Sequence, residues 1–306
     1  MIIMKKLKVG IIAEYNPFHN GHLYQIEQIK KKYPNSEIYV ALSSDYTQRG
    51  EIAILSYRKR KKLALSHGVK KVFKIPFLYS AQAAHIFADY SVKLLYKKAK
   101  IDVLCFGSET NDSELFFMIA KTIKNNQVEY NSLIKKYLKN GGNSFPKAAN
   151  LALQELTGQN IALPNDILGI EYVKTIVNND LPIDVMTIAR TVGFHSEFTN
   201  NQFASATLIR AMVKEGKDVS SYTPAVFDKI PKQIESYYPK FQRIVRKKST
   251  DTLKGYKMIT EGMENLFKKN IDLPDYETFV SECTSRRYTS SRIKRTMLFV
   301  LLKIKK

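Results

Sequence analysis

Two histidines separated by two residues stand at the start of an expected helix. His19 and His22 follow a strand-like segment, residues 7–13, and a short loop, and they precede a helix-like run over residues 23–32. Residues three apart share a helix face, and the unpaired N–H groups and dipole of a first helical turn attract phosphate. Two imidazoles there can donate hydrogen bonds to a phosphate chain as its charge shifts, while Gly21 leaves room for a nucleotide. The pattern indicates nucleotidyl transfer; a polar loop with two surface histidines is the alternative.

A second group of residues suits the departing phosphates. Ser205 and Thr207 stand at the start of an expected helix over residues 205–215, and Arg210 follows one turn later. Hydroxyls at a helix start and a guanidinium can hold a triphosphate as pyrophosphate leaves. Together with the histidine pair, this segment resembles the two motifs of the HIGH nucleotidyltransferase and class I tRNA-synthetase superfamily, whose members attack the α-phosphate of ATP. The alternative is an N-capped surface helix.

Three further positions carry weaker signals for ligand binding. Gly107 follows an apolar strand and lets the backbone approach a ligand, although a simple β-turn explains it equally well. Asn165 belongs to a group of good helix-capping residues, and Arg190 follows a strand from which it could reach a phosphate or a base. For these two residues, a simple cap and a solvated strand end are the alternatives.

The stretch over residues 286–295 mixes cations, hydroxyls and an aromatic ring. Its cations would contact phosphates, and its tyrosine could stack on a base. The pattern favours RNA contact over a basic, solvated helix start. The candidate RNA contacts are Arg286, Arg287, Tyr288, Arg292, Lys294 and Arg295.

The elements that must position these residues alternate between strands and helices up to about residue 215. This alternation predicts an α/β fold, a Rossmann-like parallel sheet with covering helices. Right-handed crossovers place the strand ends at one edge, so His19, Ser43, Ser44, Pro76 and Gly107 could line one crevice. Strands are expected at residues 9–13, 37–43, 71–75, 103–106 and 183–189, and helices at 23–32, 57–66, 83–98, 143–156, 167–177 and 205–215.

The pattern changes after about residue 216, where helical runs replace the alternation. From residue 240 to 306, 17 Lys and Arg stand against 7 Asp and Glu. We therefore expect a nucleotidyltransferase-like, ATP-binding catalytic domain over residues 1–215 and a smaller basic α-helical, RNA-binding domain over residues 216–306. Its helices are expected at residues 227–236, 240–246, 258–269, 276–282 and 291–303.

The composition bounds the partners and the compartment. The chain has 306 residues and a formal net charge of +21, which favours a polyanion such as nucleic acid over compositional drift toward lysine. Cys105 and Cys283 lack a metal-like spacing, which predicts a reducing cytoplasm and no metal site in the protein. Because the sequence shows neither a secretory leader nor about 18 successive apolar residues, we expect a cytoplasmic protein without a membrane or a stable protein partner.

Several long strings resemble the bacterial tRNA(Met) cytidine acetate ligase family. The most specific are Glu-Tyr-Asn-Pro-Phe-His-Asn-Gly-His at residues 14–22 and Asn-Asp-Ile-Leu-Gly-Ile-Glu-Tyr at residues 165–172. The chain departs from the family in being shorter, with the shortage in its C-terminal half, and in having Asp45 and Tyr46 where an asparagine and an aromatic residue are expected. The other resembling stretches, which extend the likeness over almost the whole chain, are residues 48–51, 106–109, 145–147, 205–210 and 287–289.

The resemblance implies an enzyme that activates acetate with ATP as acetyl-adenylate and releases diphosphate. It would then acetylate the wobble cytidine of elongator tRNA(Met) to N4-acetylcytidine and release AMP. Acetate and elongator tRNA(Met) are the implied partners, Mg²⁺ the expected companion of ATP, residues 216–306 the tRNA-binding domain, and His19, His22 and Arg210 the catalytic residues. The implied ATP contacts are Ile11, Ile12, Ala13, Glu14, Tyr15, Asn16, Pro17, Phe18, His19, Asn20, Gly21, His22, Leu23, Tyr24, Gly107, Asn165, Arg190, Ser205 and Thr207.

Two other functions compete with this interpretation. An adenylyltransferase acting on a small metabolite would use the same two motifs, but it gives the basic C-terminal region no role; salt-sensitive tRNA binding would separate the two. A non-catalytic RNA-binding protein would use ATP only structurally, and the intact His19, His22 and Arg210 argue against it. The sequence identifies neither an acetate pocket nor a general base for acyl transfer, and it does not show how elongator tRNA is distinguished from initiator tRNA.

Overall fold

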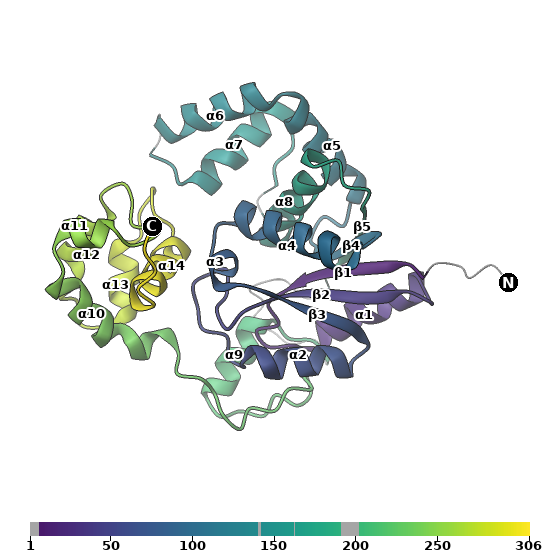
Figure 1. The fold of residues 1–306 in the computed structure, drawn as a ribbon, viewed down its shortest axis with the longest axis horizontal. Helices are drawn as coiled ribbons and strands as arrows, with labels where there is room; N and C mark the ends of the chain where they lie inside the picture. Colours follow the sequence, from purple (N-terminus) through teal and green to yellow (C-terminus); the bar gives the residue numbers. More distant parts are fainter. Residues whose placement is uncertain (1–5, 140–141, 162, 191–201) are drawn as a thin grey trace.

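The computed structural model describes residues 6–139, 142–161, 163–190 and 202–306. Its centre is a five-stranded sheet in the order β3-β2-β1-β4-β5, in which every pairing is parallel (Figure 1). All the carboxyl ends of the strands therefore lie at one edge. The strands are β1 (Lys8–Ala13), β2 (Glu37–Ser43), β3 (Val69–Ile75), β4 (Val103–Ser108) and β5 (Asp184–Ala189).

Helices cover both faces of this sheet and bury an apolar core on each side. One core joins the sheet to the first two helices, and the other joins it to the helices that follow β3 and β4 (Figure 1). Strands buried on both faces are expected to be apolar throughout, which explains their near-continuous valine and isoleucine runs. The helices are α1 (Asn20–Lys32), α2 (Tyr57–Ser66), α3 (Phe77–Ser80), α4 (Ala84–Ala99), α5 (Ser113–Asn125), α6 (Gln127–Lys139), α7 (Phe145–Thr157), α8 (Pro164–Asn178) and α9 (Ala206–Lys214).

A separate core belongs to the short helices after residue 233, which we call the helical unit. The sheet and its covering helices form the first unit. The centre of the separate core is a cluster of rings from Phe241, Phe267 and Phe279, whose centroids lie 5.4–5.5 Å apart. Phe77 from the first unit packs on Phe299, with ring centroids 4.8 Å apart, so the two units are in contact. The elements are η1 (Ile234–Tyr237), α10 (Tyr238–Lys247), α11 (Thr250–Lys254), α12 (Met263–Asn270), α13 (Tyr276–Cys283) and α14 (Ser290–Leu301).

The predicted fold class, a Rossmann-like parallel sheet followed by a basic helical region, is confirmed. Two predicted helices are wrong in part. Residues 227–233 are not helical, because Pro231 lacks an N–H and restricts the residue before it. The helix predicted from Met258 begins only at Met263, because Met258, Glu261 and Gly262 have positive φ angles. The sequence patterns also did not predict α5 and α6.

The segment after α9 returns to the loop that carries the histidines. The backbone carbonyl of Tyr222 accepts from the N–H of Asn20 (2.9 Å), and the Thr223 hydroxyl donates to the carbonyl of Phe18 (2.5 Å). Residues 219–225 therefore pack against the first unit, while the core of the second begins at Ile234. The boundary between residues 215 and 216 stays a prediction. Within the described ranges, no helix has the length and apolarity needed to cross a membrane.

Candidate active site

His19 and His22 form a pair of tilted, closely packed rings at the start of α1. His19 is the N-cap residue, and its Nδ1 accepts from the N–H of Gly21 (3.0 Å); Nδ1 of His22 accepts from the N–H of His19 (3.1 Å). The ring centroids are 3.9 Å apart. Because each Nδ1 accepts, the hydrogen-bond pattern assigns the proton of each neutral ring to Nε2. The pair thus presents two N–H donors beyond the helix start.

Burial keeps both imidazoles neutral. It lowers the pKa of His19 to about 3, assisted by the positive charges of Arg190 and Arg210. Burial also lowers the pKa of His22 well below its ordinary value, with His19 and Arg190 adding to the effect. Neutral donors can bind phosphate oxygens without supplying a proton, which suits stabilisation of a developing charge rather than acid catalysis.

Gly21 is required by the histidine pair itself. A Cβ at this position would lie 2.8 Å from Cε1 and 3.0 Å from Nδ1 of the His19 ring. The sequence had suggested that Gly21 leaves room for a nucleotide, and its backbone does line the cavity described below. The closer constraint is that only glycine lets His19 fold back to cap the helix.

The start of α9 faces the same space. Ser205 caps the helix by accepting from the N–H of Leu208 (3.1 Å). Nη1 of Arg210 donates to the carbonyl of Asn16 (2.8 Å), and Nη2 lies 3.3 Å from the Thr207 hydroxyl and 3.9 Å from a Glu51 oxygen. The guanidinium is thus held in the loop between β1 and α1, next to the histidines.

Asn165 and Arg190 are oriented by one carboxylate. Glu109 accepts from the side-chain amide of Asn165 (2.5 Å) and from the N–H of Asp166 (3.1 Å), and it lies 3.9 Å from Nε of Arg190. Asp166 in turn accepts from the N–H groups of Glu109 and Thr110 (3.0 Å each). The loop after β4 and the start of α8 therefore fix each other.

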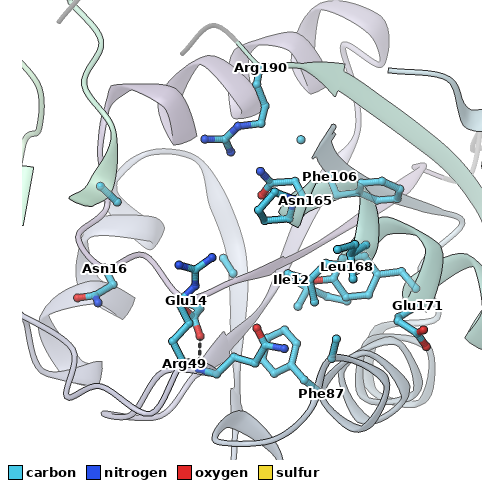
Figure 2. A pocket seen from close by; sticks show the side chains of 18 of the residues that line it. Ile12, Glu14, Asn16, Arg49, Phe87, Phe106, Asn165, Leu168, Glu171 and Arg190 are labelled. Atoms are coloured by element: carbon cyan, nitrogen blue, oxygen red, sulfur yellow. Dashed lines mark hydrogen bonds between the residues drawn. The ribbon is translucent and has the colours of Figure 1, made fainter. Parts of the chain in front are cut away.

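These residues border one cavity of about 650 Å³ at the carboxyl edge of the sheet (Figure 2). That size falls within the range of small-molecule sites. At its histidine end, which we define by His19, His22, Arg190, Ser205, Thr207 and Arg210, it brings together all three predicted catalytic residues. The predicted ATP contacts that line it are Ile12, Ala13, Glu14, Tyr15, Asn16, His19, Gly21, His22, Tyr24, Gly107, Asn165, Arg190, Ser205 and Thr207.

Other predicted residues lie outside the cavity wall. Ile11 and Phe18 are buried in the core beneath the sheet, and Asn20 donates instead to the carbonyls of Gln202 and Ser221 (2.8 and 2.9 Å). Pro17 and Leu23 also do not line the cavity. For the side chains of these residues, contact with ATP therefore has no support in the geometry.

The expected crevice also needs correction. Ser43 ends β2 and Ser44 follows it, but both are buried beside Arg60, which donates to the Ser43 hydroxyl (3.3 Å) and to the carbonyl of Ser44. Pro76 caps α3 and does not line the cavity. These strand ends build the wall behind the site rather than the site itself.

The cavity continues into a chamber that the sequence did not reveal. We call it the aromatic chamber; it lies among α4, α6, α7 and α8, away from the histidine end. Figure 2 shows Phe87, Leu168 and Glu171 on the side of the cavity away from Asn16. The rings of His85 and Phe145 have their centroids 5.5 Å apart. The strings at residues 145–147 and 165–172 contain four of the chamber's residues, but only the fold brings them together with residues of α4 and α6. The chamber is lined by His85, Phe87, Tyr130, Phe145, Leu168, Glu171 and Tyr172.

The loop over residues 47–51 joins the site to the helical unit. The N–H of Gln48 donates to Glu14 (2.5 Å), and the carbonyl of Gln48 accepts from Arg295 on α14 (3.0 Å). Gly50, with φ of +84°, lies so close to α14 that a Cβ would be 2.5 Å from the backbone nitrogen of Arg295. The loop is thus held between the two units.

The predicted RNA contacts fall into two groups. Arg286 and Arg287 are exposed. Tyr288 is buried, donates its hydroxyl to the carbonyl of Glu261 (2.5 Å) and has the guanidinium of Arg292 over its ring. Its burial argues against base stacking, because the ring has no free face for a base.

Lys294 and Arg295 also have partners inside the protein. Lys294 lies 3.6 Å from a Glu51 oxygen, and Arg292 donates to the Thr260 hydroxyl (2.8 Å). Arg295 is buried, and this burial lowers its pKa to about 10. Arg295 lines the cavity between the units rather than an outer surface, so the prediction of a surface RNA contact is corrected for this residue.

Comparison with known proteins gives concordant results. The profile of the HIGH Nucleotidyl Transferase family matches residues 5–306. The tRNA(Met) cytidine acetate ligase of Mycoplasma mobile is 53% identical, over 98% of this chain and 100% of its own length; that of Listeria monocytogenes is 33% identical, over 97% and 80%. The crystal structure of Thermotoga maritima TmcAL bound with alpha-thio ATP is 29% identical, with a TM-score of 0.87, and covers 98% of this chain and 76% of that chain.

Proposed function

The chain belongs to the tRNA(Met) cytidine acetate ligase family of HIGH nucleotidyltransferases, and from this membership we propose the reaction that it catalyses. It uses ATP and acetate to convert the wobble cytidine of elongator tRNA(Met) to N4-acetylcytidine, with AMP and diphosphate as the other products. The substrate assignment rests on the names of relatives that match almost the full chain. The reaction class rests on the site.

The observation that carries the proposal is the set of donors at the histidine end of the cavity. Two neutral imidazoles, Arg190 and Arg210 surround one space. An acetate oxygen attacks the α-phosphorus of ATP, the bond to the β-phosphate oxygen breaks, and pyrophosphate leaves. Charge moves onto the bridging and α-phosphate oxygens in this step, where preorganised donors are most effective. The product is acetyl-adenylate.

ATP binds, in this proposal, with its phosphates at the starts of α1 and α9. Both are capped helix starts at the carboxyl edge of a parallel sheet, where anions bind favourably. Asn165, held by Glu109, then contacts the nucleoside part beside the Gly107 backbone. The crystal structure of Thermotoga maritima TmcAL, which this chain resembles, contains an analogue of ATP, alpha-thio ATP.

Mg²⁺ enters the proposal through the nucleotide. Mg²⁺ is commonly held by substrate phosphates, its own waters and one or two carboxylates. The described residues contain no group of three or more His, Cys, Asp or Glu that could hold a metal ion. The triphosphate therefore supplies most of its ligands here.

The basic helical unit gives the tRNA a place to bind. Exposed Arg286 and Arg287 precede α14, whose first turn contributes Thr289 and Ser291 to the cavity wall. A backbone held by these arginines would place a nucleotide at the cavity mouth between the two units. A cytoplasmic location, where tRNA and ATP meet, completes the proposal.

Acetate-dependent exchange of labelled pyrophosphate into ATP tests the proposed activation step. The proposal requires exchange that starts only when acetate is present, without tRNA. Exchange that does not depend on acetate but requires a phosphorylated metabolite would support the small-metabolite adenylyltransferase instead. Absence of exchange under every condition would contradict both.

A further inference from the structure

Among the residues that the structure describes, three carboxylates line the cavity, and two of them lie close to cationic side chains. Glu51 lies 3.9 Å from Arg210 and 3.6 Å from Lys294, and Glu171 lies 2.9 Å from Lys174. Glu14 forms no ion pair with any residue that the structure describes. Its Oε1 accepts from the N–H of Gln48 (2.5 Å; Figure 2), and its Oε2 has no hydrogen-bond partner in those ranges. Among the cavity carboxylates of the described residues, Glu14 is therefore the one without an ion-pair partner.

Glu14 lies between the two ends of the cavity. It immediately follows β1, and Figure 2 shows its carboxylate with Asn16 on one side and Ile12 and Leu168 on the other. Burial lowers the pKa of Arg210, and the nearby Glu51 and Glu14 oppose that change. Burial raises the pKa of Tyr172 in the aromatic chamber, and Glu14 adds to it. One carboxylate thus acts electrostatically on both ends.

The charge of Glu14 does not suit the triphosphate. A carboxylate that faces phosphate oxygens is repelled, more strongly in a cavity than in water. Its surroundings suit a base, since burial raises the pKa of Glu14 and the nearby Glu51 carboxylate adds to the rise, whereas the Gln48 N–H and the charges of Arg49 and Arg60 limit it. A carboxylate of raised pKa accepts a proton more readily than an exposed one. The side chain is therefore available for the second half of the reaction.

We propose that Glu14 is the catalytic base of acyl transfer, taking a proton from the exocyclic amine of cytidine as the amine attacks acetyl-adenylate. The inference rests on the proposed function. The amine nitrogen forms a bond to the acetyl carbon, the bond from that carbon to the phosphate oxygen breaks, and AMP leaves with the electron pair. The proton lost by the nitrogen passes to the Glu14 carboxylate. In the aromatic chamber, the rings of the two exposed residues, His85 and Phe145, supply the stacking surfaces that a base taken out of its stack requires.

The Glu14→Gln variant separates the two half-reactions. Glutamine keeps the size of the side chain and an oxygen for the Gln48 N–H, but it cannot take the proton. Acetate-dependent pyrophosphate exchange should persist, while single-turnover transfer from preformed acetyl-adenylate to tRNA should slow by about 10²–10⁴-fold. In the unchanged protein, transfer should rise with pH through the pKa of Glu14 and then level off. The variant should lose that rise.

Two further variants keep the test decisive. Glu14→Asp retains a carboxylate, so transfer should remain faster than in Glu14→Gln and should still rise with pH. Glu155→Gln makes the same chemical change at an exposed site outside the cavity and should leave both half-reactions unchanged. Equal losses of exchange and transfer in Glu14→Gln, or unaltered transfer, would overturn the proposal. If the unchanged protein shows exchange but labels no tRNA, the acceptor assignment fails and this role for Glu14 fails with it.

Discussion

At the scale of single residues, the chemistry depends on imidazoles that donate without being charged. Their tautomer follows from the caps that they make, since Nδ1 of each ring is occupied by a backbone N–H. Their neutrality follows from burial beside Arg190 and Arg210. The helix cap and the phosphate donors are thus the same two side chains.

Replacing one of these donors should lower the rate of acetate activation strongly while the protein still folds. His22→Ala removes an Nε2–H and one side of the capping box, so acetate-dependent pyrophosphate exchange should fall by about 10²–10³-fold. His67→Ala is the matched control, because His67 ends α2 and does not line the cavity. Equal rates in the two variants would exclude His22 from the activation step.

The neutral histidines also predict a dependence of stability on pH. The pKa of His19 is about 3 in the folded chain and about 6.5 when exposed, so the unfolded chain binds the additional proton. The contribution of neutral His19 to the free energy of unfolding is complete above pH 6.5 and is lost as the pH falls from 6.5 toward 3. Urea unfolding at several pH values should show that the free energy of unfolding falls less on acidification in His19→Gln than in the unchanged protein. Parallel curves would contradict the assignment.

At the scale of elements, one loop connects the site with the helical unit. Residues 47–51 accept from Arg295, donate to Glu14 and place Glu51 between Arg210 and Lys294. This arrangement requires a close approach of Gly50 to α14. The loop thus contacts both α14 and the Arg210 side chain of the histidine end.

Gly50→Ala should separate these elements. The added Cβ is strained at φ of +84° and would lie 2.5 Å from the backbone of Arg295. We expect a loss of unfolding free energy on the order of 1–3 kcal/mol, together with slower tRNA acetylation. Gly158→Ala has a similar φ, +70°, but nothing within 4 Å, so its loss should be smaller. Equal losses in urea unfolding would show that only backbone strain matters.

The elements that the sequence predicted best are those with a local cause. β2 and α2 are apolar or cap-bounded runs, and their predicted bounds match. The start of α12 was missed because it depends on successive positive φ angles that residue type alone does not indicate. The motifs predicted the histidine end, but the assembly of the aromatic chamber and the place of Glu14 between the two ends of the cavity depend on contacts between distant helices and loops. Burial of Tyr288 and Arg295 likewise results from packing that a basic sequence pattern conceals.

At the scale of the whole molecule, the charge balance favours a polyanion partner. The chain has a net charge of +21, and residues 240–306, in the unit that borders the cavity mouth, have 17 Lys and Arg against 7 Asp and Glu. Long-range attraction would guide tRNA to this face, and the cavity would then receive the nucleotide.

Replacing Arg286 and Arg287 together by alanine should weaken tRNA binding without affecting acetate activation. Each lost phosphate contact lowers the steepness of the salt dependence by about 0.7–0.9 in a double-logarithmic plot, so the pair should lower it by up to about 2. Replacing exposed Lys97 and Lys98 at the end of α4 is the control of equal charge. Binding titrations at several salt concentrations would contradict the assignment if both pairs behaved alike.

The most direct test of the account is the fate of labelled acetate. The protein is incubated with ATP, Mg²⁺, labelled acetate and purified elongator or initiator tRNA(Met), and the nucleosides are analysed by mass spectrometry. The proposed function predicts labelled N4-acetylcytidine in elongator tRNA, dependent on ATP and lost in His22→Ala. Release of AMP and diphosphate without label in tRNA, or no turnover of ATP at all, would contradict it.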